Sequence, residues 1–400
     1  MRNRQTKKHL VRVVIVGGGF AGIKAALKLA KDDKVHVTIV SDKDYFLFYP
    51  ALYATATGGS KRQSVLPLAD LFANTNVTIV KDIVLSIDES RKILVMEENQ
   101  LGYDKVIFAL GVITSYFGIA GLDKYSYSIK STQEIDRFKK HLHDEIIQDK
   151  HLDKNYIVVG AGPTGVELSA SLTHYLEVIS AKHAIKHAKI RLSLVEAAPR
   201  VLPRMSERAS ELVSERLKKL GIKVLINNKV QSEDDDSIVI NGKDIPSQTV
   251  VWTSGVTNHP FFLEHSDVFK LAPNGKVIVD DQLKVSRNIY VIGDNAGTTF
   301  SGLAQTAIYD GIFAAKSISA EVRKQSPPHY SARKQPVVIP VGHNWAILEY
   351  GSIRITGPIA SLVRRCADMI GYLDYVAFPD ALKLFLSESQ HEEVCEVCKT

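Results

Sequence analysis

Cysteine is scarce in this chain. Only three cysteines occur among its 400 residues, and Cys366, Cys395 and Cys398 all lie in the last tenth of the sequence. A disulfide framework therefore cannot hold most of the fold, and a reducing cytoplasm is the expected compartment. Cys395 and Cys398 form a single CxxC without a second pair at ligand spacing, so a solvated tail is favoured over a zinc site.

Long apolar runs are also lacking. No stretch approaches the ~20 consecutive apolar residues that cross a bilayer, so any membrane contact is expected to be peripheral. The net charge of +6 is only mildly basic, and no basic stripe is interleaved with aromatics. We therefore expect no nucleic-acid partner, and nothing in the sequence predicts a metal site.

Glycine, by contrast, is concentrated in two similar motifs. The ranges Gly17–Gly22 and Gly160–Gly165 both have the GxGxxG spacing. Each follows an apolar run typical of a strand, Val11–Val16 or Tyr156–Val159, and each precedes a helix-like segment. Such a turn lets the backbone approach a pyrophosphate, and the following helix N-terminus offers N–H groups to the phosphates. The chain is therefore predicted to bind two dinucleotides.

The motifs belong to an internal repeat. Each half continues with a second strand, Val35–Val40 or Leu192–Val195, and with an apolar strand that ends near a glycine, Gly111 or Gly255. The charged piece 131–154 is predicted to be an exposed helix and connection into the second half. From about residue 276 the chain should return to the first half.

Acidic residues distinguish the two predicted sites. Glu196 follows the strand Leu192–Val195, where a carboxylate accepts hydrogen bonds from a ribose and repels a 2′-phosphate, which favours NADH over NADPH. The nearby Arg200 and Arg204 argue somewhat against this choice. At the matching position of the first half stand Ser41 and Asp42, and which of them meets the ribose is left open.

Asp294 closes the segment 288–294. Together with the first glycine motif it resembles the flavin site of two-dinucleotide-binding-domain flavoproteins, in which the aspartate binds the ribityl chain of FAD. The alternative is an ordinary turn or N-cap residue. Glu167 lies in the first turn after the second motif. One interpretation is that it interacts with the helix dipole and has no further role.

Taken together, Gly17–Gly22, Gly160–Glu167, Val251–Gly255, Asp294 and Ala304-Gln305 resemble the type II NADH dehydrogenases, the single-subunit NADH:quinone oxidoreductases. The resemblance implies that Glu167 faces the nicotinamide and flavin and that Gln305 helps to shape a quinone site. In the family a second glutamine follows four residues later, whereas this chain has Tyr309, which can still hydrogen-bond or stack on a quinone.

The residues expected to contact the cofactors fall into two sets. Those for FAD are Gly17, Gly19, Phe20, Ala21, Gly22, Ser41, Asp42, Val84, Ala109, Gly111, Asp294, Ala304 and Gln305. Those for NADH are Gly160, Gly162, Pro163, Thr164, Gly165, Glu167, Glu196 and Gly255. Glu167, Gln305 and Tyr309 are the expected catalytic residues.

The C-terminal segment 359–378 carries apolar residues at helical spacing. The helix either packs on the core or lies in the membrane interface, as the C-terminal region of the resembled family does.

We therefore predict an α/β protein with two Rossmann-like domains, the second inserted in the first, and a small membrane-associating C-terminal unit. The expected bounds are 8–120 with 270–323 for the FAD domain, 121–269 for the NADH domain and 336–400 for the C-terminal unit.

The predicted activity is hydride transfer from NADH to flavin N5, followed by transfer of two electrons to menaquinone or ubiquinone, without proton pumping. The expected location is the cytoplasmic face of the cell membrane, and a homodimer is left open. Alternatives are a ferredoxin- or rubredoxin-reductase-like flavoprotein and an NADH redox sensor like the apoptosis-inducing-factor relatives. Sulfide:quinone oxidoreductases are disfavoured because residues 1–365 contain no cysteine.

Overall fold

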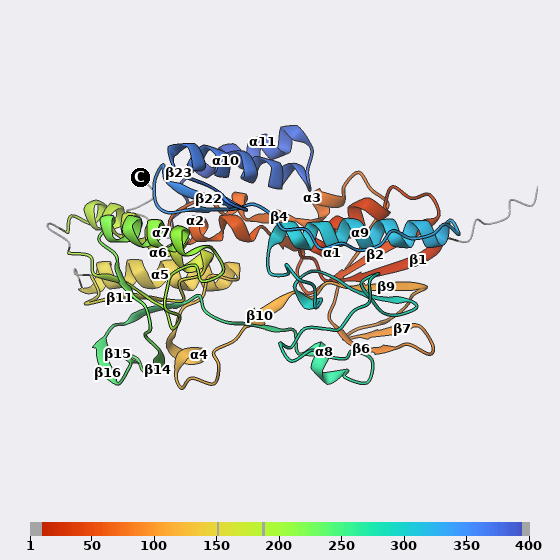
Figure 1. Ribbon diagram of the computed structural model, residues 1–400, viewed down its shortest axis with the longest axis horizontal. Coiled ribbons are helices and arrows are strands. Elements are labelled where there is room, and N and C mark those ends of the chain that lie inside the picture. Colours follow the sequence, from red (N-terminus) through yellow and green to blue (C-terminus); the bar gives the residue numbers. More distant parts are fainter. Residues whose placement is uncertain (1–9, 150–151, 186–188, 394–400) are drawn as a thin grey trace, which may run out of the picture.

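The computed structural model describes residues 10–149, 152–185 and 189–393. Two α/β domains lie side by side, and a smaller C-terminal unit covers them on one side (Figure 1). The predicted CxxC at Cys395 and Cys398 lies outside the described residues.

The first domain is built on a six-stranded sheet in the order β19-β20-β9-β1-β2-β5. All neighbouring strands pair in parallel except β19 and β20. The central strand is buried from Val13 to Val16, as expected for a parallel strand covered on both faces. Its strands are β1 (Val11–Val16), β2 (Val35–Ser41), β5 (Thr78–Lys81), β9 (Lys105–Phe108), β19 (Lys284–Ser286) and β20 (Ile289–Val291).

Two long helices cover one face of this sheet. The helices α1 (Phe20–Leu29) and α9 (Ala304–Val322) run along each other, although they are far apart in sequence (Figure 1). A hairpin is formed by β6 (Val84–Asp88) and β7 (Ile93–Met96) and is extended by β8 (Gln100–Gly102). The remaining elements are β3 (Tyr45–Leu47), β4 (Val65–Pro67), α2 (Leu52–Ala56), α3 (Leu68–Phe72), α8 (Phe261–Glu264) and the short 3-10 helices at Tyr49–Ala51, Lys61–Gln63 and Gly293–Asn295.

The second domain repeats this plan with a four-stranded parallel sheet in the order β13-β12-β11-β17. A ribbon of β10 and β18 joins the two domains. The elements are β10 (Val112–Thr114), α4 (Leu122–Tyr125), α5 (Thr132–Asp149), β11 (Tyr156–Val159), α6 (Pro163–Lys182), β12 (Leu192–Val195), α7 (Glu207–Lys219), β13 (Lys223–Leu225), β14 (Val230–Glu233), β15 (Ser237–Ile240), β16 (Lys243–Pro246), β17 (Thr249–Trp252) and β18 (Val256–Asn258).

The chain returns to the first sheet after the second domain, because β20 pairs with β9 in parallel. The predicted insertion of one Rossmann-like domain into the other is therefore confirmed. The residue at which each domain begins or ends stays a prediction.

The prediction that α5 is exposed was wrong. Phe138 and Leu142 are fully buried in the core of the second domain. Lys139 is only 1% exposed, because its ammonium group donates to the Glu392 carbonyl at the end of the described chain. The sequence showed a charged helix, but it could not show that a segment more than 240 residues later covers its polar side.

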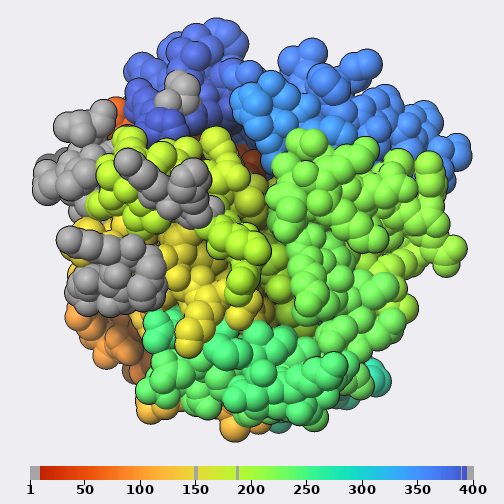
Figure 2. All heavy atoms as spheres, turned by 90° about the vertical axis from the view of Figure 1, so that its left-hand side faces the viewer, coloured from red at the N-terminus to blue at the C-terminus, as the bar shows by residue number. Residues whose placement is uncertain are grey.

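The C-terminal unit is a three-stranded antiparallel sheet with two helices. It contains β21 (Val337–Pro340), β22 (Ala346–Tyr350), β23 (Ile353–Gly357), α10 (Pro358–Leu373) and α11 (Phe378–Leu386), followed by a 3-10 turn at Ser387–Ser389. The predicted helix is present as α10, but it ends at Leu373 and does not continue to Phe378, where α11 starts. Figure 2 shows this unit, in blue, seated above the second domain, in green.

Candidate active site

The first glycine motif forms a tight turn between β1 and α1. Gly17 has a φ of +116°, and a Cβ there would lie 2.3 Å from the Ala109 carbonyl oxygen. A Cβ on Gly22 would lie 2.1 Å from the Gly17 carbonyl oxygen. Both positions therefore require glycine, and the turn is fixed against the end of β9.

This turn also leaves room for a ligand. A Cβ built on Gly19 meets no atom within 4 Å, and Gly19 is the N-cap of α1 without a side-chain cap. The first N–H groups of a helix have no partner within the helix. The space and the donors together fit a pyrophosphate, so the residues present suit the predicted dinucleotide.

Asp294 lies next to this turn, directly after β20. Its Oδ1 accepts a hydrogen bond from Gly302 N at 2.9 Å. Burial raises the pKa of Asp294, while the Gly302 N–H and the charges of Lys276 and Arg204 oppose that rise. Asp294 also contributes to the raised pKa of Tyr49, so the loop before α2 faces the same site.

Asn295 is a structural residue that the sequence reasoning missed. Its Oδ1 accepts from Gly111 N at 2.8 Å, and its Nδ2 donates to the Gly111 carbonyl. Asn295 is fully buried and thus ties the end of β9 to the end of β20. In the sequence, only its position beside Asp294 could have indicated this role, because its partner Gly111 lies 184 positions away.

The remaining residues of the first set lie on α1, at the end of β2 and on β6. Ser41 is buried, and its Oγ would be 2.8 Å from a Cβ on Gly18. Asp42 is exposed, and its carboxylate lies 3.9 Å from Lys43 Nζ. Val84 starts β6 and is buried at the edge of the core. Phe20 and Ala21 open α1 and are buried.

The second motif repeats the geometry of the first. A Cβ on Gly165 would lie 1.8 Å from the Gly160 carbonyl oxygen, whereas Gly162 again meets nothing within 4 Å. Gly162 is the N-cap of α6, which begins with Pro163 and Thr164 and has no side-chain cap. At the end of β17, a Cβ on Gly255 would meet the Phe117 ring.

Glu196 reaches into this second turn. Its carboxylate accepts from Ala161 N at 2.7 Å and from Ala198 N at 2.8 Å. Arg200 donates to the Pro203 carbonyl at 2.9 Å, and Arg204 lies 3.2 Å from a Cβ on Gly302. Glu196 is thus held at the turn, whereas Arg200 bonds to the Pro203 carbonyl and Arg204 lies near Gly302.

Glu167 meets the C-terminal unit. Arg364 of α10 donates to Glu167 Oε1 at 3.0 Å and to the Pro50 carbonyl at 2.9 Å, and it also pairs with Asp368 at 2.8 Å. Burial raises the pKa of Glu167 to about 7, although Arg364 acts to lower it. The sequence reasoning missed Arg364 and Asp368, although their i,i+4 spacing on an apolar helix was visible.

The start of α9 carries the other two expected catalytic residues. Gln305 is exposed in the first turn of α9, whose N-cap Leu303 provides no side-chain cap. Tyr309 follows one turn later, with its ring 5.8 Å from that of Tyr330 and the Arg333 guanidinium 5.0 Å above it. Tyr309 therefore packs against the linker that leads to the C-terminal unit.

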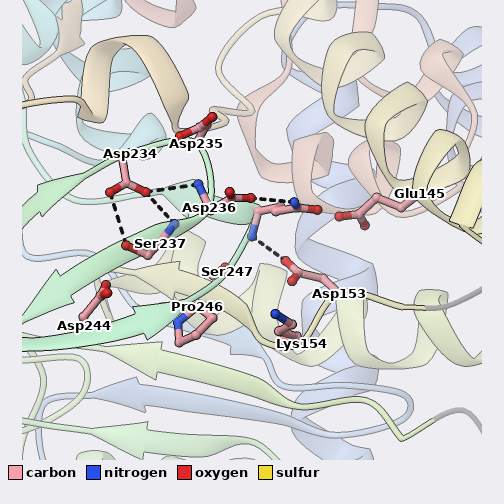
Figure 3. Close-up of a pocket in the computed structure, with 11 residues that line it drawn as sticks. Glu145, Asp153, Lys154, Asp234, Asp235, Asp236, Ser237, Asp244, Pro246 and Ser247 are labelled. Atoms are coloured by element: carbon pink, nitrogen blue, oxygen red, sulfur yellow. Dashed lines mark hydrogen bonds between the residues drawn. The ribbon is translucent and has the colours of Figure 1, made fainter.

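A separate pocket of about 700 Å³ lies in the second domain, between the segment around Asp153 and the β14–β15 turn (Figure 3). It contains none of the predicted site residues, and most of its lining side chains are acidic. Phosphates are repelled by such a surface, so this pocket is not the dinucleotide site.

Comparisons with known proteins agree with this geometry. The family model for pyridine nucleotide-disulphide oxidoreductases matches residues 11–311. The type II NADH:quinone oxidoreductase Ndh of Mycobacterium tuberculosis is 30% identical over 387 residues, which cover 88% of this chain and 82% of that protein. The chain belongs to the type II NADH:quinone oxidoreductases. A member from Staphylococcus saprophyticus is 25% identical, with 89% of this chain and 94% of that protein covered.

Solved structures show the same fold. NDH2 from Plasmodium falciparum in complex with NADH has a TM-score of 0.84 at 19% identity, with 94% of this chain and 97% of that chain covered. The sulfide:quinone oxidoreductase from Aquifex aeolicus has a TM-score of 0.79, also at 19% identity, and covers 96% of this chain. For this type II NADH:quinone oxidoreductase, the predicted fold class, enzyme class and cofactors FAD and NADH are confirmed.

Proposed function

We propose that the turn at Gly17–Gly22 holds FAD and the turn at Gly160–Gly165 holds NADH. We further propose that quinone is reduced between the start of α9 and the Arg364–Glu167 pair. The observation that carries this proposal is the duplicated turn, in which Gly19 and Gly162 each leave open space before an uncapped helix. Flavin, when bound, accepts a hydride from NADH at N5 and passes two electrons to quinone.

The first turn is assigned to FAD because Asp294 lies beside it. Asp294 is half-buried, and such a carboxylate is stabilised by hydroxyl donors like those of a ribityl chain. The backbone around Ala109 and Gly111, held by Asn295, forms the floor of this site. Ala304 and Gln305 bring the positive end of α9 towards it, which favours a negatively charged reduced cofactor.

The second turn is assigned to NADH because Glu196 is fixed there by two backbone N–H groups. The carboxylate still has lone pairs for the ribose hydroxyls, and its charge disfavours a 2′-phosphate. Arg200 donates to the Pro203 carbonyl and Arg204 lies near Gly302, which weakens the argument for NADPH.

The acceptor site is assigned to Gln305, Tyr309 and Glu167. Gln305 is exposed and can donate a hydrogen bond to a quinone oxygen. Tyr309 forms a wall one helical turn further along, in place of the family's second glutamine. Glu167, with a pKa of about 7, can release or take up a proton near neutral pH. Whether menaquinone or ubiquinone is preferred stays open.

The C-terminal unit is proposed to rest on the cytoplasmic surface of the membrane. Its apolar face consists of large side chains that point outward from α10 and α11, namely Ile359, Leu362, Ile370, Leu373, Phe378, Leu382 and Leu386. Ile359, for example, is 65% exposed. A continuous apolar surface of this kind is typical of a helix that lies in the membrane interface. Among the described residues, no helix combines the length and apolar content needed to span a bilayer.

One steady-state experiment tests this proposal. NADH and NADPH are compared as donors, and menaquinone and ubiquinone analogues as acceptors, with and without liposomes. We expect a strong preference for NADH, turnover with quinone, and a higher rate with liposomes. Bound FAD that NADH reduces but that no short-chain quinone reoxidises would overturn the assignment of the acceptor site. One chain suffices for this function, and the homodimer stays a prediction.

A further inference from the structure

A groove of about 370 Å³ lies between α1 and the end of α10. Lys24 and Lys28 of α1 and Lys31, two residues beyond its end, line one wall, and residues Leu373–Val376 line the other. None of these lysines belongs to the cofactor or quinone sites described above. The groove is therefore a basic cavity that the redox reaction does not use.

Lys24 fixes the position of this groove. Its ammonium group is almost buried and donates to Asp374 Oδ1 at 2.5 Å and to the Asp374 carbonyl at 2.7 Å. Asp374 is the C-cap of α10, so the lysine holds the end of this helix against α1. The charge of Lys24 is thereby largely balanced.

Lys28 and Lys31 are not balanced in this way. Within the ranges that the structure describes, no carboxylate lies within ion-pair distance of either ammonium group. The pKa of Lys28 is lowered by partial burial and by the neighbouring charges of Lys24, Lys31 and Lys316, while the charge of Asp374 opposes this shift. Repulsion of this kind is relieved when an anion binds between the cations.

The groove adjoins the apolar face of the C-terminal unit. Leu373 belongs to both, since it lines the groove and is 41% exposed. When an apolar helix lies in the membrane interface, groups at its edge are at the level of the lipid phosphates. Lysines in this position are attracted to anionic headgroups.

We propose that this groove binds the phosphate of an anionic phospholipid headgroup through Lys28 and Lys31. The inference rests on the proposed seating of the apolar face on a membrane. The side chain of Asn74 and the Lys24–Asp374 pair frame the groove and offer further hydrogen bonds to the glycerol part of the lipid.

The test uses the FAD-loaded full chain and two kinds of vesicle, phosphatidylcholine alone and phosphatidylcholine with phosphatidylglycerol. Co-sedimentation is measured for the parent chain, for K28S/K31S and for K229S/K243S. The control lowers the net charge by the same amount at exposed lysines in the part of the second domain opposite α10 and α11 (Figure 1). NADH oxidation with a soluble quinone should be unchanged in both variants.

We expect the parent chain to bind phosphatidylglycerol vesicles more tightly than neutral ones, and less tightly as salt is added. K28S/K31S should lose about 25-fold in affinity for the anionic vesicles, at about five-fold per lysine, while K229S/K243S loses little. If K28S/K31S binds them like the control, the groove assignment is wrong although the membrane seating holds. If the parent chain binds neither vesicle, the membrane seating fails, and this proposal fails with it.

Discussion

Arg364 Nη1 lies 3.0 Å from Glu167 Oε1, and this ion pair joins the C-terminal unit to the second turn of α6 in the second domain. Both side chains are only 11% exposed. Arg364 also donates to the Pro50 carbonyl of the first domain and to the Val338 carbonyl of β21. One guanidinium group therefore contacts all three parts of the molecule.

We expect Arg364→Met to destabilise the protein by about 3–5 kcal/mol, because it leaves the buried carboxylates of Glu167 and Asp368 without their cation. Thermal unfolding of the FAD-loaded chain measures this loss. Arg365→Met is the matched control, since Arg365 is 60% exposed and its nearest carboxylate oxygen is 3.9 Å away. Equal unfolding temperatures for the two variants would show that the Arg364 contacts contribute little.

The quinone half-reaction should depend on pH near neutrality. The pKa of Glu167 is raised to about 7, and so is that of Glu388, which is raised by burial and by Asp368. Glu167→Gln should remove the pH dependence of flavin reoxidation, whereas Glu388→Gln should leave it in place. Rapid-mixing experiments across pH 5–9 separate the two groups. An unchanged pH profile in Glu167→Gln would remove the role assigned to this carboxylate.

Stability should also change with pH through Glu167. Its folded-state pKa of about 7 exceeds that of an unfolded glutamate, ~4.3, so the folded state binds the proton more tightly. The tighter proton binding by Glu167 stabilises the folded state fully below the pKa of the unfolded glutamate. This stabilisation is lost as the pH rises through the folded-state pKa of about 7. Glu167→Gln should therefore flatten the dependence of the free energy of unfolding on pH in this window. Denaturant titrations at several pH values measure this slope.

The two glycine turns can be tested by one substitution made in each. Gly19→Val and Gly162→Val place a side chain in open space, at residues whose φ values of −93° and −72° suit any amino acid. Gly19→Val should lower the FAD content of the purified protein. Gly162→Val should retain FAD but raise the KM for NADH. Each variant is the control for the other, and FAD loss in both would contradict the assignment of the two sites.

Glu196→Ser should weaken the preference for NADH. The carboxylate is held at the second turn. Loss of its hydrogen bonds to the ribose of NADH should lower kcat/KM for NADH by about ten-fold. The ratio of kcat/KM for NADPH and NADH measures the change. Arg200→Ser is a suitable control, because Arg200 binds the Pro203 carbonyl. An unchanged ratio in Glu196→Ser would contradict the proposed role.

The sequence predicted those features that depend on local patterns. The turns at Gly17 and Gly160 follow from glycine spacing after short buried strands, and the return of the chain to the first sheet follows from the segment before Asp294. These features were predictable because a nucleotide-binding turn constrains residues that are close in sequence.

Contacts between distant segments were not predictable in this way. Arg364 and Glu167 are 197 positions apart, and neither residue indicates the other. Likewise, Lys139 is buried only because the segment near Glu392 returns to cover α5. Lys24 likewise binds the end of α10, a contact across 350 positions.

Electrons are proposed to pass from NADH through FAD to quinone in this one chain. Anaerobic stopped-flow mixing tests this transfer directly by following the absorbance of bound flavin. The flavin should be bleached on mixing with NADH, and its absorbance should return when a menaquinone or ubiquinone analogue is added. Bleached flavin that stays reduced in the presence of both quinones would show that the protein does not pass electrons to quinone.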